Sequence, residues 1–458
     1  MRRTINLLHL SALVATLLLT GNSRADEADW KAGLAQLKIT PEQPIFLAGY
    51  SSRNKPYSKI ENDLYVKALV LEDQAGQRAV LITSDLIGYP AEIAEPICAR
   101  LEKKLGLKRE QVLISSSHIH TGPELSLDPK ARGSMSEGDA QRTVAYTKLL
   151  QERTVAVVEK AAAKLEPARL RFGSGVVHFA MNRRQFTPTG VVLGANPRGL
   201  ADRSVPLLRI DTPEGKPRCL LFGAAVHNTT LRGQHYEVCG DYAGFAQEYV
   251  QEKLPGVQAM FMLGCAGDAD PYPHGSMELA RRHGLELGKE VCRVAEGKLQ
   301  PVRGPLRLAF AQVELPLQKA PPRDELEKQA KQRGVQAWIA QQMIQRLDRG
   351  ETLPTSYRCP QAVWQFGDDL TLVALSGEVV VDYVTLLEKA LGPNKLWIAA
   401  YSNDVYGYLP SARVLAEGGY ETRGLYHGGI GLFDPGAEKV LVDAVKKLAK
   451  QAGRKLPG

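Results

Sequence analysis

Long apolar stretches are scarce in this chain of 458 residues. After residue 25, none approaches the roughly 18 to 20 residues that a membrane-spanning helix needs. The chain also lacks internal repeats, low-complexity tracts and a Pro/Ser-rich linker that would divide it. Its hydrophobic content of 44% and charged content of 24% are ordinary for a globular protein. These features predict a single large soluble domain over residues 26–458.

Cysteine motifs are the second absence. The chain has six cysteines but no Cys-x-x-Cys pair, which argues against a thiolate zinc site. Two interpretations of these cysteines are equally compatible with the sequence. One is one or two disulfides formed in an oxidising compartment, and the other is buried free thiols. The sequence leaves both open for Cys98, Cys219, Cys239, Cys265, Cys292 and Cys359.

A basic stripe of the kind that binds nucleic acid is also missing. The formal net charge is +8, and part of it comes from Arg2, Arg3 and Arg24, which lie in a segment without acidic residues. Elsewhere basic and acidic residues are mixed, as in Glu102-Lys103-Lys104. This pattern predicts a solvated surface and no nucleic-acid partner.

The N-terminus has the pattern of a secretory signal. Arg2 and Arg3 precede a mostly apolar run from Leu7 to Leu19, and small residues follow at Ser23 and Ala25. We predict a signal peptide over residues 1–25, with cleavage after Ala25 and export of the mature protein to the periplasm or outside the cell. An uncleaved N-terminal anchor is the alternative reading.

The order of apolar patterns predicts an α/β fold. Strand-like runs at residues 65–71 and 77–83 precede a helical pattern at 91–105 and another strand at 111–116. A strand–helix–strand order favours mixed, partly parallel sheets covered by helices. Further strands are expected at 169–177, 205–210, 218–227, 257–263, 305–316, 369–375 and 395–401, and helices at 143–165, 241–253, 278–295 and 435–452. A polar loop should contain residues 182–184 and 196–197, and residues 321–349 should form a charged helical excursion.

Residues 115–124, Ser-Ser-Ser-His-Ile-His-Thr-Gly-Pro-Glu, contain the clearest candidate site. They follow an apolar strand that Gly122 and Pro123 end. Side chains two apart on a strand point to the same face, so we expect His118 and His120 to converge. Such a pair suits a metal ion, or one ligand and one proton-transfer group. An ordinary polar loop is the competing interpretation.

Candidate ligands also follow three other predicted strands. His227 ends one strand, Glu378 follows a second, and Tyr408 follows a third. In open α/β sheets, sites gather at the carboxyl ends of strands. Imidazoles and a carboxylate are common ligands of catalytic zinc, and a tyrosine joins such a set when the metal lowers its pKa. Alternatively, His227 is a hydrogen-bonded core residue, Glu378 an acid at a helix N-terminus, and Tyr408 a core side chain.

At these residues the chain resembles the neutral (non-lysosomal) ceramidases. The Thr-His-Thr-His-Ser-Gly-Pro segment of that family is similar to residues 117–123, and its Gly-Asp-x-Ser-Pro segment is similar to Gly267–Pro271. Its tyrosine motifs keep their spacing at Tyr408 and Tyr420. Further similar segments, in the same order, are His227–Thr229, Cys239–Ala246, Gly377–Glu378 and Tyr420–Glu421.

The resemblance implies an α/β catalytic domain with one zinc ion. The zinc ligands of the family correspond to His118, His227, Glu378 and Tyr408. His120 and Tyr420 correspond to residues that touch the scissile amide, and Arg183 to an arginine that helps to position the substrate.

The chain departs from the family pattern at three points. Asp270 stands where the family has a serine often named as the nucleophile, which excludes serine nucleophilic catalysis there. Asn228 replaces a proline, and we expect no counterpart of the family's C-terminal β-sandwich in these 458 residues. Asp270 would then act as a base, or shape a turn. Asp241 and Asp268 are candidates to orient the ligand imidazoles, or are helix-cap and turn carboxylates.

These observations predict a secreted zinc-dependent amidohydrolase that cleaves an N-acyl, ceramide-like amide with metal-activated water. A lipid- or glycan-binding protein that kept the fold without catalysis is one alternative, and a metal-dependent esterase or peptidase is another. Iron or manganese also accept such ligands. The expected partner is a small N-acyl or lipid substrate, with contact to a membrane surface compatible with it. The oligomeric state stays open.

Overall fold

The computed structural model describes residues 29–130, 133–332, 335–425 and 429–457. The predicted signal peptide at residues 1–25 lies outside these ranges. Within them, no helix is both long enough and apolar enough to cross a bilayer.

A nine-stranded mixed sheet forms the centre of the molecule. Its strand order is β12-β10-β9-β6-β1-β3-β4-β5, and β14 pairs with β6. The two outermost pairs of strands, β4–β5 and β10–β12, are parallel, and the other pairs are antiparallel. The strands are β1 (Trp30–Lys38), β3 (Tyr65–Asp73), β4 (Arg78–Ser84), β5 (Val112–Ser116), β6 (Glu166–Val176), β9 (Ser204–Asp211), β10 (Pro217–Ala224), β12 (Gln258–Leu263) and β14 (Gln300–Val302).

A four-stranded sheet packs on one face of the larger sheet. It has the order β15-β16-β17-β19, and β17–β19 is its parallel pair. Its strands are β15 (Leu306–Pro316), β16 (Ser356–Phe366), β17 (Leu370–Ala374) and β19 (Leu396–Ala399). Buried side chains of both sheets form one apolar cluster, in which Leu113 and Met260 of the larger sheet join Trp364 and Trp397 of the smaller one. The predicted class, mixed α/β with partly parallel sheets, is confirmed.

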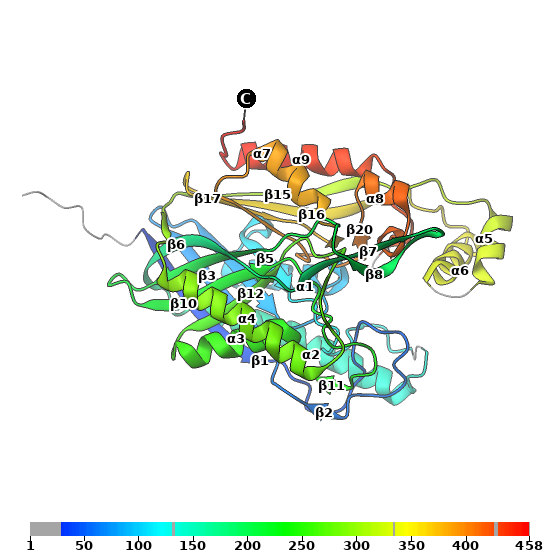
Figure 1. Ribbon diagram of the computed structural model, residues 1–458, viewed down its shortest axis with the longest axis horizontal. Helices are drawn as coiled ribbons and strands as arrows, with labels where there is room; N and C mark the ends of the chain where they lie inside the picture. Colours follow the sequence, from blue (N-terminus) through cyan, green and yellow to red (C-terminus); the bar gives the residue numbers. More distant parts are fainter. Residues whose placement is uncertain (1–28, 131–132, 333–334, 426–428, 458) are drawn as a thin grey trace, which may run out of the picture.

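Helices cover the two outer faces (Figure 1). The larger sheet carries α1 (Ala91–Leu105), α2 (Glu137–Ala162), α3 (Asp241–Lys253) and α4 (Met277–Glu296), and the smaller one carries α7 (Asp382–Leu391) and α9 (Ala437–Gln451). In α1 the apolar spacing buries Ile93, Ile97 and Leu101, and the helix ends at Gly106, whose φ of 69° suits a left-handed C-cap. The predicted excursion is helical, as α5 (Arg323–Ala330) and α6 (Val335–Asp348).

The prediction of a polar loop around residues 182–184 was wrong. These residues lie in β7 (Ala180–Thr187), which forms a hairpin with β8 (Gly190–Asn196) and pairs at its root with β13 (Ala269–Pro271). Asn182, Arg183 and Arg184 are polar yet buried among partners from distant segments, so this part of β7 carries no apolar strand pattern. Likewise, α2 begins six residues before the predicted start, because Ser136 and Asp139 form a capping box there.

Short elements complete the site region and the loops. They are β2 (Lys59–Ile60), η1 (Arg109–Gln111), β11 (Glu237–Val238), β18 (Glu378–Val379), β20 (Tyr408–Leu409), α8 (Ala412–Glu417) and η2 (Tyr420–Thr422). The six cysteines all fall in the described ranges and are free thiols, five of them buried. The structure therefore follows the thiol reading rather than the disulfide reading.

Candidate metal centre

The candidate ligands meet because three parallel strand pairs end at the same place. His118 follows β5, His227 follows β10, and Glu378 follows β17. Strands β5 and β12 lie at opposite ends of the sheet order, yet the sheet curves enough to bring them into contact. The smaller sheet joins this edge, where Asn403 N donates to Ile114 O at 2.7 Å. The carboxyl ends of strands from both sheets thus surround one site.

His118 and His120 converge, but not by strand geometry. Strand β5 ends at Ser116, and His118 has a left-handed φ of 59°. Its Nε2 lies 3.2 Å from Nε2 of His120. A left-handed non-glycine residue typically costs 1–3 kcal/mol, so the surrounding contacts hold this loop in place. Gly49 also has positive φ, and a side chain there would lie 2.3 Å from Nδ1 of His120.

Three ring nitrogens and one carboxylate form the centre. The ring nitrogens of His118, His120 and His227 lie within 4.8 Å of one another. Glu378 Oε2 lies 3.2 Å from Nε2 of His118 and 3.1 Å from Nε2 of His227. A tetrahedral metal with bonds of about 2.0–2.1 Å has ligand atoms roughly 3.3–3.4 Å apart, so this spacing fits a metal ion.

The tautomers of two imidazoles support the same conclusion. His118 Nδ1 lies 2.5 Å from Ile87 O, and His227 Nδ1 lies 2.7 Å from Ala266 O. A carbonyl oxygen only accepts, so each Nδ1 carries a proton, and each Nε2 presents a lone pair when the imidazole is neutral. Both Nε2 atoms point to the carboxylate of Glu378, and a cation between them would bind the neutral form of each ring. The donor set therefore fits a divalent metal.

Of the two interpretations of Asp241 and Asp268, the structure follows the helix-cap and turn one, since backbone carbonyls hold the imidazoles of His118 and His227. Asp241 accepts from the backbone N–H of Leu231 and of Tyr242 at the start of α3. Asp268 accepts from Val381 N at 2.7 Å and from the side chain of Asn182. Both carboxylates thus brace the loops that carry the ligands.

Burial sets the protonation of the centre. It holds the pKa of His120 well below its usual range, and the neighbouring His118 and His227 lower it further. Burial and then the Arg183 guanidinium lower the pKa of His227 to about 4. Burial alone would raise the pKa of Glu378, but His118 and His227 outweigh it and hold that pKa well below 4.5. Neutral imidazoles and an ionised carboxylate are the forms that bind a metal.

This shift predicts a pH dependence of the metal-free protein. The pKa of His227 is 6.5 in a model peptide and about 4 in the fold. Between these values the unfolded chain binds a proton that the folded chain does not, so stability falls as pH falls through this window. With a chelator present, the wild type should lose roughly 3 kcal/mol more than His227→Asn between pH 7 and pH 4, measured by urea unfolding. Equal losses in the two proteins would contradict the assignment.

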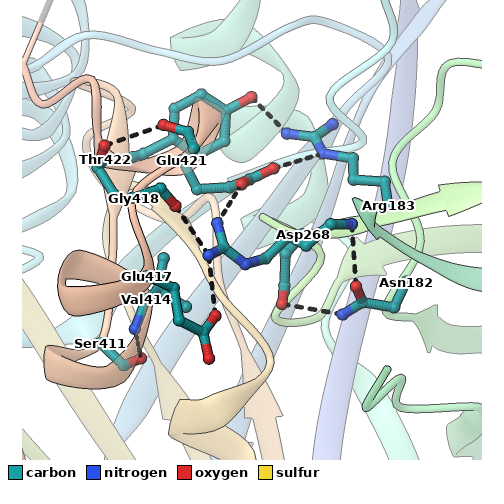
Figure 2. Close-up of polar contacts among 12 residues, drawn as sticks. Asn182, Arg183, Asp268, Ser411, Val414, Glu417, Gly418, Glu421 and Thr422 are labelled. Carbon is teal, nitrogen blue, oxygen red and sulfur yellow. Dashed lines mark hydrogen bonds and ion pairs between the residues drawn. The ribbon is translucent and has the colours of Figure 1, made fainter. Parts of the chain in front are cut away.

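A buried ion-pair network borders the centre (Figure 2). Arg183 donates from Nε to Glu421 Oε1 at 3.0 Å and from Nη2 to the Tyr408 hydroxyl at 2.9 Å. Arg184, next along β7, donates from Nη1 to Glu421 Oε2 at 2.7 Å and from Nη2 to Glu417. Glu421 thus ties both arginines to η2. Arg183 thus contacts Tyr408 at the centre, and the neighbouring Arg184 contacts Glu417 of α8.

Asp270 is held by two arginines. Its Oδ1 lies 3.2 Å from Arg183 Nη1, and its Oδ2 lies 2.8 Å from Arg232 Nη2. Thr229 donates to the same Oδ1. Burial by itself would raise the pKa of Asp270, but the two guanidiniums outweigh it and hold that pKa far below 3.8. The structure brings Asp270 beside the centre as a weakly basic carboxylate.

Tyr408 and Tyr420 also lie at the centre. Tyr408 is the register partner of Glu378 in β18–β20, and its ring stacks 6.5 Å from that of His227. The ring of Tyr420 lies 5.5 Å from that of Tyr408, with Arg183 and Arg423 over its face. Burial raises the pKa of both phenols, so both carry protons at neutral pH in the metal-free protein.

Comparison with known proteins assigns the chain to a family. The family model described as neutral/alkaline non-lysosomal ceramidase, N-terminal, matches residues 30–307. The chain belongs to this family. The match contains His118, His120, Arg183, His227 and Asp270, whereas Glu378, Tyr408 and Tyr420 lie beyond it. The resemblance found in the sequence is therefore confirmed.

Similar proteins include the neutral ceramidase of Pseudomonas aeruginosa, 26% identical over 270 residues, and neutral ceramidase A of Dictyostelium discoideum, 23% identical over 272 residues. The matches cover 56% and 55% of this chain, but only 39% and 37% of those proteins. The crystal structure of the Pseudomonas aeruginosa enzyme has the same fold, with a TM-score of 0.71 and 20% identity, covering 94% of this chain and 76% of that one. The chain thus spans about two fifths of the curated relatives it matches.

Two residues of the centre were missed in the sequence. Tyr401 follows β19, has a φ of 50°, and packs its ring 4.5 Å from that of His118. Arg232 reaches Asp270 from a loop after His227. Tyr401 stands at a strand end like the other site residues, which is a usable signal. Arg232 has none, because only the fold brings it to Asp270.

Proposed function

We propose that this protein is a zinc-dependent amidohydrolase that cleaves an N-acyl, ceramide-like amide with water. The observation that carries the proposal is the convergence of His118, His227 and Glu378, whose Nε2 and Oε2 atoms lie 3.1–3.2 Å apart, the spacing of ligands around one metal ion. Zinc favours two imidazoles and a carboxylate in catalytic sites. Membership of the ceramidase family supports the choice of an amide over other substrates.

His118, His227, Glu378 and Tyr408 would hold the zinc. When bound, the ion supplies Lewis acidity that polarises a carbonyl and lowers the pKa of water to near 7. Tyr408 accepts a hydrogen bond from Arg183 at 2.9 Å, and this contact fixes its hydroxyl. In this way Arg183 acts as a positioning residue.

His120 is the proposed proton-transfer group. Its imidazole is neutral at pH 7 because burial lowers its pKa, so it is able to accept a proton from the attacking water and return it to the leaving amine. Its Nδ1 is buried and has no hydrogen-bond partner within the described part of the chain. Because Nδ1 lies against Gly49, the imidazole meets the centre through its Nε2, 3.2 Å from Nε2 of His118. Tyr420 keeps its proton and would donate to the oxyanion of the tetrahedral intermediate.

We assign Asp270 to positioning rather than to proton abstraction. Both of its oxygens already accept hydrogen bonds, Oδ1 from Thr229 and Arg183 and Oδ2 from Arg232, so neither is open to a proton from water. The carboxylate instead holds Arg183 beside Tyr408. With no serine at this position, water is the nucleophile in this proposal, and no acyl-enzyme forms there. The apolar N-terminal segment supports export of the protein.

The proposal is tested with an N-acyl sphingosine, a short-chain N-acyl amide and the matching ester. We expect the metal-loaded protein to release the fatty acid from the amides. A chelator should lower this turnover by at least about 100-fold, and added zinc should restore it. Cleavage of the ester alone would favour the esterase alternative. Tight lipid binding without turnover, in protein that holds zinc, would favour the binding-protein alternative.

A further inference from the structure

The β7–β8 hairpin extends from the centre to the surface (Figure 1). At its root, Asn182, Arg183 and Arg184 are almost completely buried. Beyond Arg184 the strands are largely exposed, and the ribbon carries large apolar side chains into solvent. Phe186 is 59% exposed, Val192 45% and Leu193 50%, and Leu200 just after the hairpin is 50% exposed. Contiguous exposed apolar side chains of this size commonly mark a docking surface.

These apolar side chains lie on both faces of the ribbon. Phe186 pairs with Val191, and Leu193 pairs with Arg184, so Phe186 and Leu193 share a face. Val192 pairs with Gln185 and points to the opposite face. A folded protein partner would cover one face and leave the other exposed. Insertion of the whole tip into a fluid apolar phase covers both.

The charge of the segment matches a lipid surface. Residues 180–201 contain three arginines and neither aspartate nor glutamate. Arg183 and Arg184 are paired at the root, whereas the side chain of Arg198 is exposed and has no ion-pair partner in the ranges that the structure describes. An exposed arginine beside apolar side chains is attracted to lipid phosphate while its stem stays in the apolar layer.

The distance to the centre also fits. Phe186 lies three residues beyond Arg183, which is about 10 Å along a strand. Interfacial segments bury their apolar side chains about 5–10 Å into the boundary between head groups and acyl chains. With Phe186 at that depth, Arg183 and the centre would lie level with the head groups. A lipid amide is found at that level of a bilayer.

We propose that residues 185–200, the exposed part of the β7–β8 hairpin and the loop after it, dock the protein on a phospholipid bilayer. A lipid amide would then enter the centre from the membrane. This inference rests on the proposed function for its purpose, but vesicle binding is measured without turnover. The docking element is local, because it consists of one hairpin whose root belongs to the centre.

The test is sedimentation of the protein with vesicles of phosphatidylcholine, with and without phosphatidylglycerol. The ribbon variant is Phe186→Thr/Val192→Thr/Leu193→Thr, since threonine keeps strand propensity. The control is Leu149→Gln/Leu285→Gln/Val440→Gln, which removes three exposed apolar side chains of 38–40% exposure from helices elsewhere. We expect the ribbon variant to bind at least about tenfold more weakly than the wild type, and the control to stay within about twofold. Arg198→Gln should weaken binding to the anionic vesicles only.

Turnover of a soluble short-chain amide separates the two proposals. Unchanged turnover in a ribbon variant that no longer binds vesicles supports docking. Vesicle binding by a wild type that cleaves no amide would leave docking standing and sink the proposed function. If the triple variant fails to fold, Phe186→Trp replaces it, and a blue shift of its fluorescence with vesicles is expected.

Three results would overturn docking. One is wild type that stays in the supernatant with both kinds of vesicle. Another is a ribbon variant that binds vesicles as tightly as the wild type, or a Phe186→Trp protein whose fluorescence does not shift with vesicles. The third is a dimer that the ribbon variant abolishes while vesicles have no effect, which would assign the surface to a second copy of the chain.

Discussion

His227→Ala is expected to remove the bound metal and nearly all amide turnover. Its Nε2 faces Glu378 at 3.1 Å, and its Nδ1 is fixed by Ala266 O. Loss of a group that merely orients a metal ligand costs roughly 10–100-fold in affinity or activity, so loss of a ligand should cost more than about 100-fold. Elemental analysis of the purified proteins should give about one zinc per wild-type chain and none per variant chain.

The matched control is His178→Ala, because His178 is an exposed histidine outside the centre. It should keep both zinc and turnover. A wild type that holds no metal after zinc is supplied would sink the catalytic proposal. A His227→Ala protein with full zinc would show that the metal is bound elsewhere.

Glu421→Ala is expected to be among the most destabilising single changes outside the apolar core. The carboxylate is buried and pairs with Arg183 at 3.0 Å and with Arg184 at 2.7 Å. Removing one partner of a buried pair typically costs about 3–5 kcal/mol, and here two buried guanidiniums would be left with Asp270 and Glu417 alone. Urea unfolding should measure this loss. Turnover should fall as well, since Arg183 loses a contact that fixes it beside Tyr408.

Glu417→Ala is the control for this prediction. Glu417 also pairs with Arg184, but its side chain is 23% exposed and Arg184 keeps Glu421. We expect a loss of about 1 kcal/mol or less. If the two variants lose the same stability, Glu421 does not carry the network.

The strand ends could be predicted from the sequence because they depend on local patterns. The apolar run before Ser115 identifies a strand without any tertiary information, although β5 ends at Ser116, before the Gly122-Pro123 break that was expected to end it. The same kind of pattern identified His227 and Glu378. Helix α1 was predicted with its observed bounds, because its apolar spacing marks its buried face and lysines mark its last turn.

The sequence failed where a side chain depends on a distant partner. Asn182, Arg183 and Arg184 suggest a solvated loop, yet in the fold they lie in a buried strand. Their burial is possible because Glu421, 238 residues after Arg183, supplies the opposite charge. No local pattern encodes a pairing over that separation.

The chain by itself therefore determined the mixed α/β class, the family and the residue types that follow each strand. Tertiary structure alone decided that the ends of β5, β10 and β17 meet at one point. It also decided the imidazole tautomers, because the carbonyls of Ile87 and Ala266 set them, and a backbone carbonyl leaves no trace in a sequence. The sequence specifies which side chains are present, whereas contacts between segments far apart in the chain decide whether those side chains form a site.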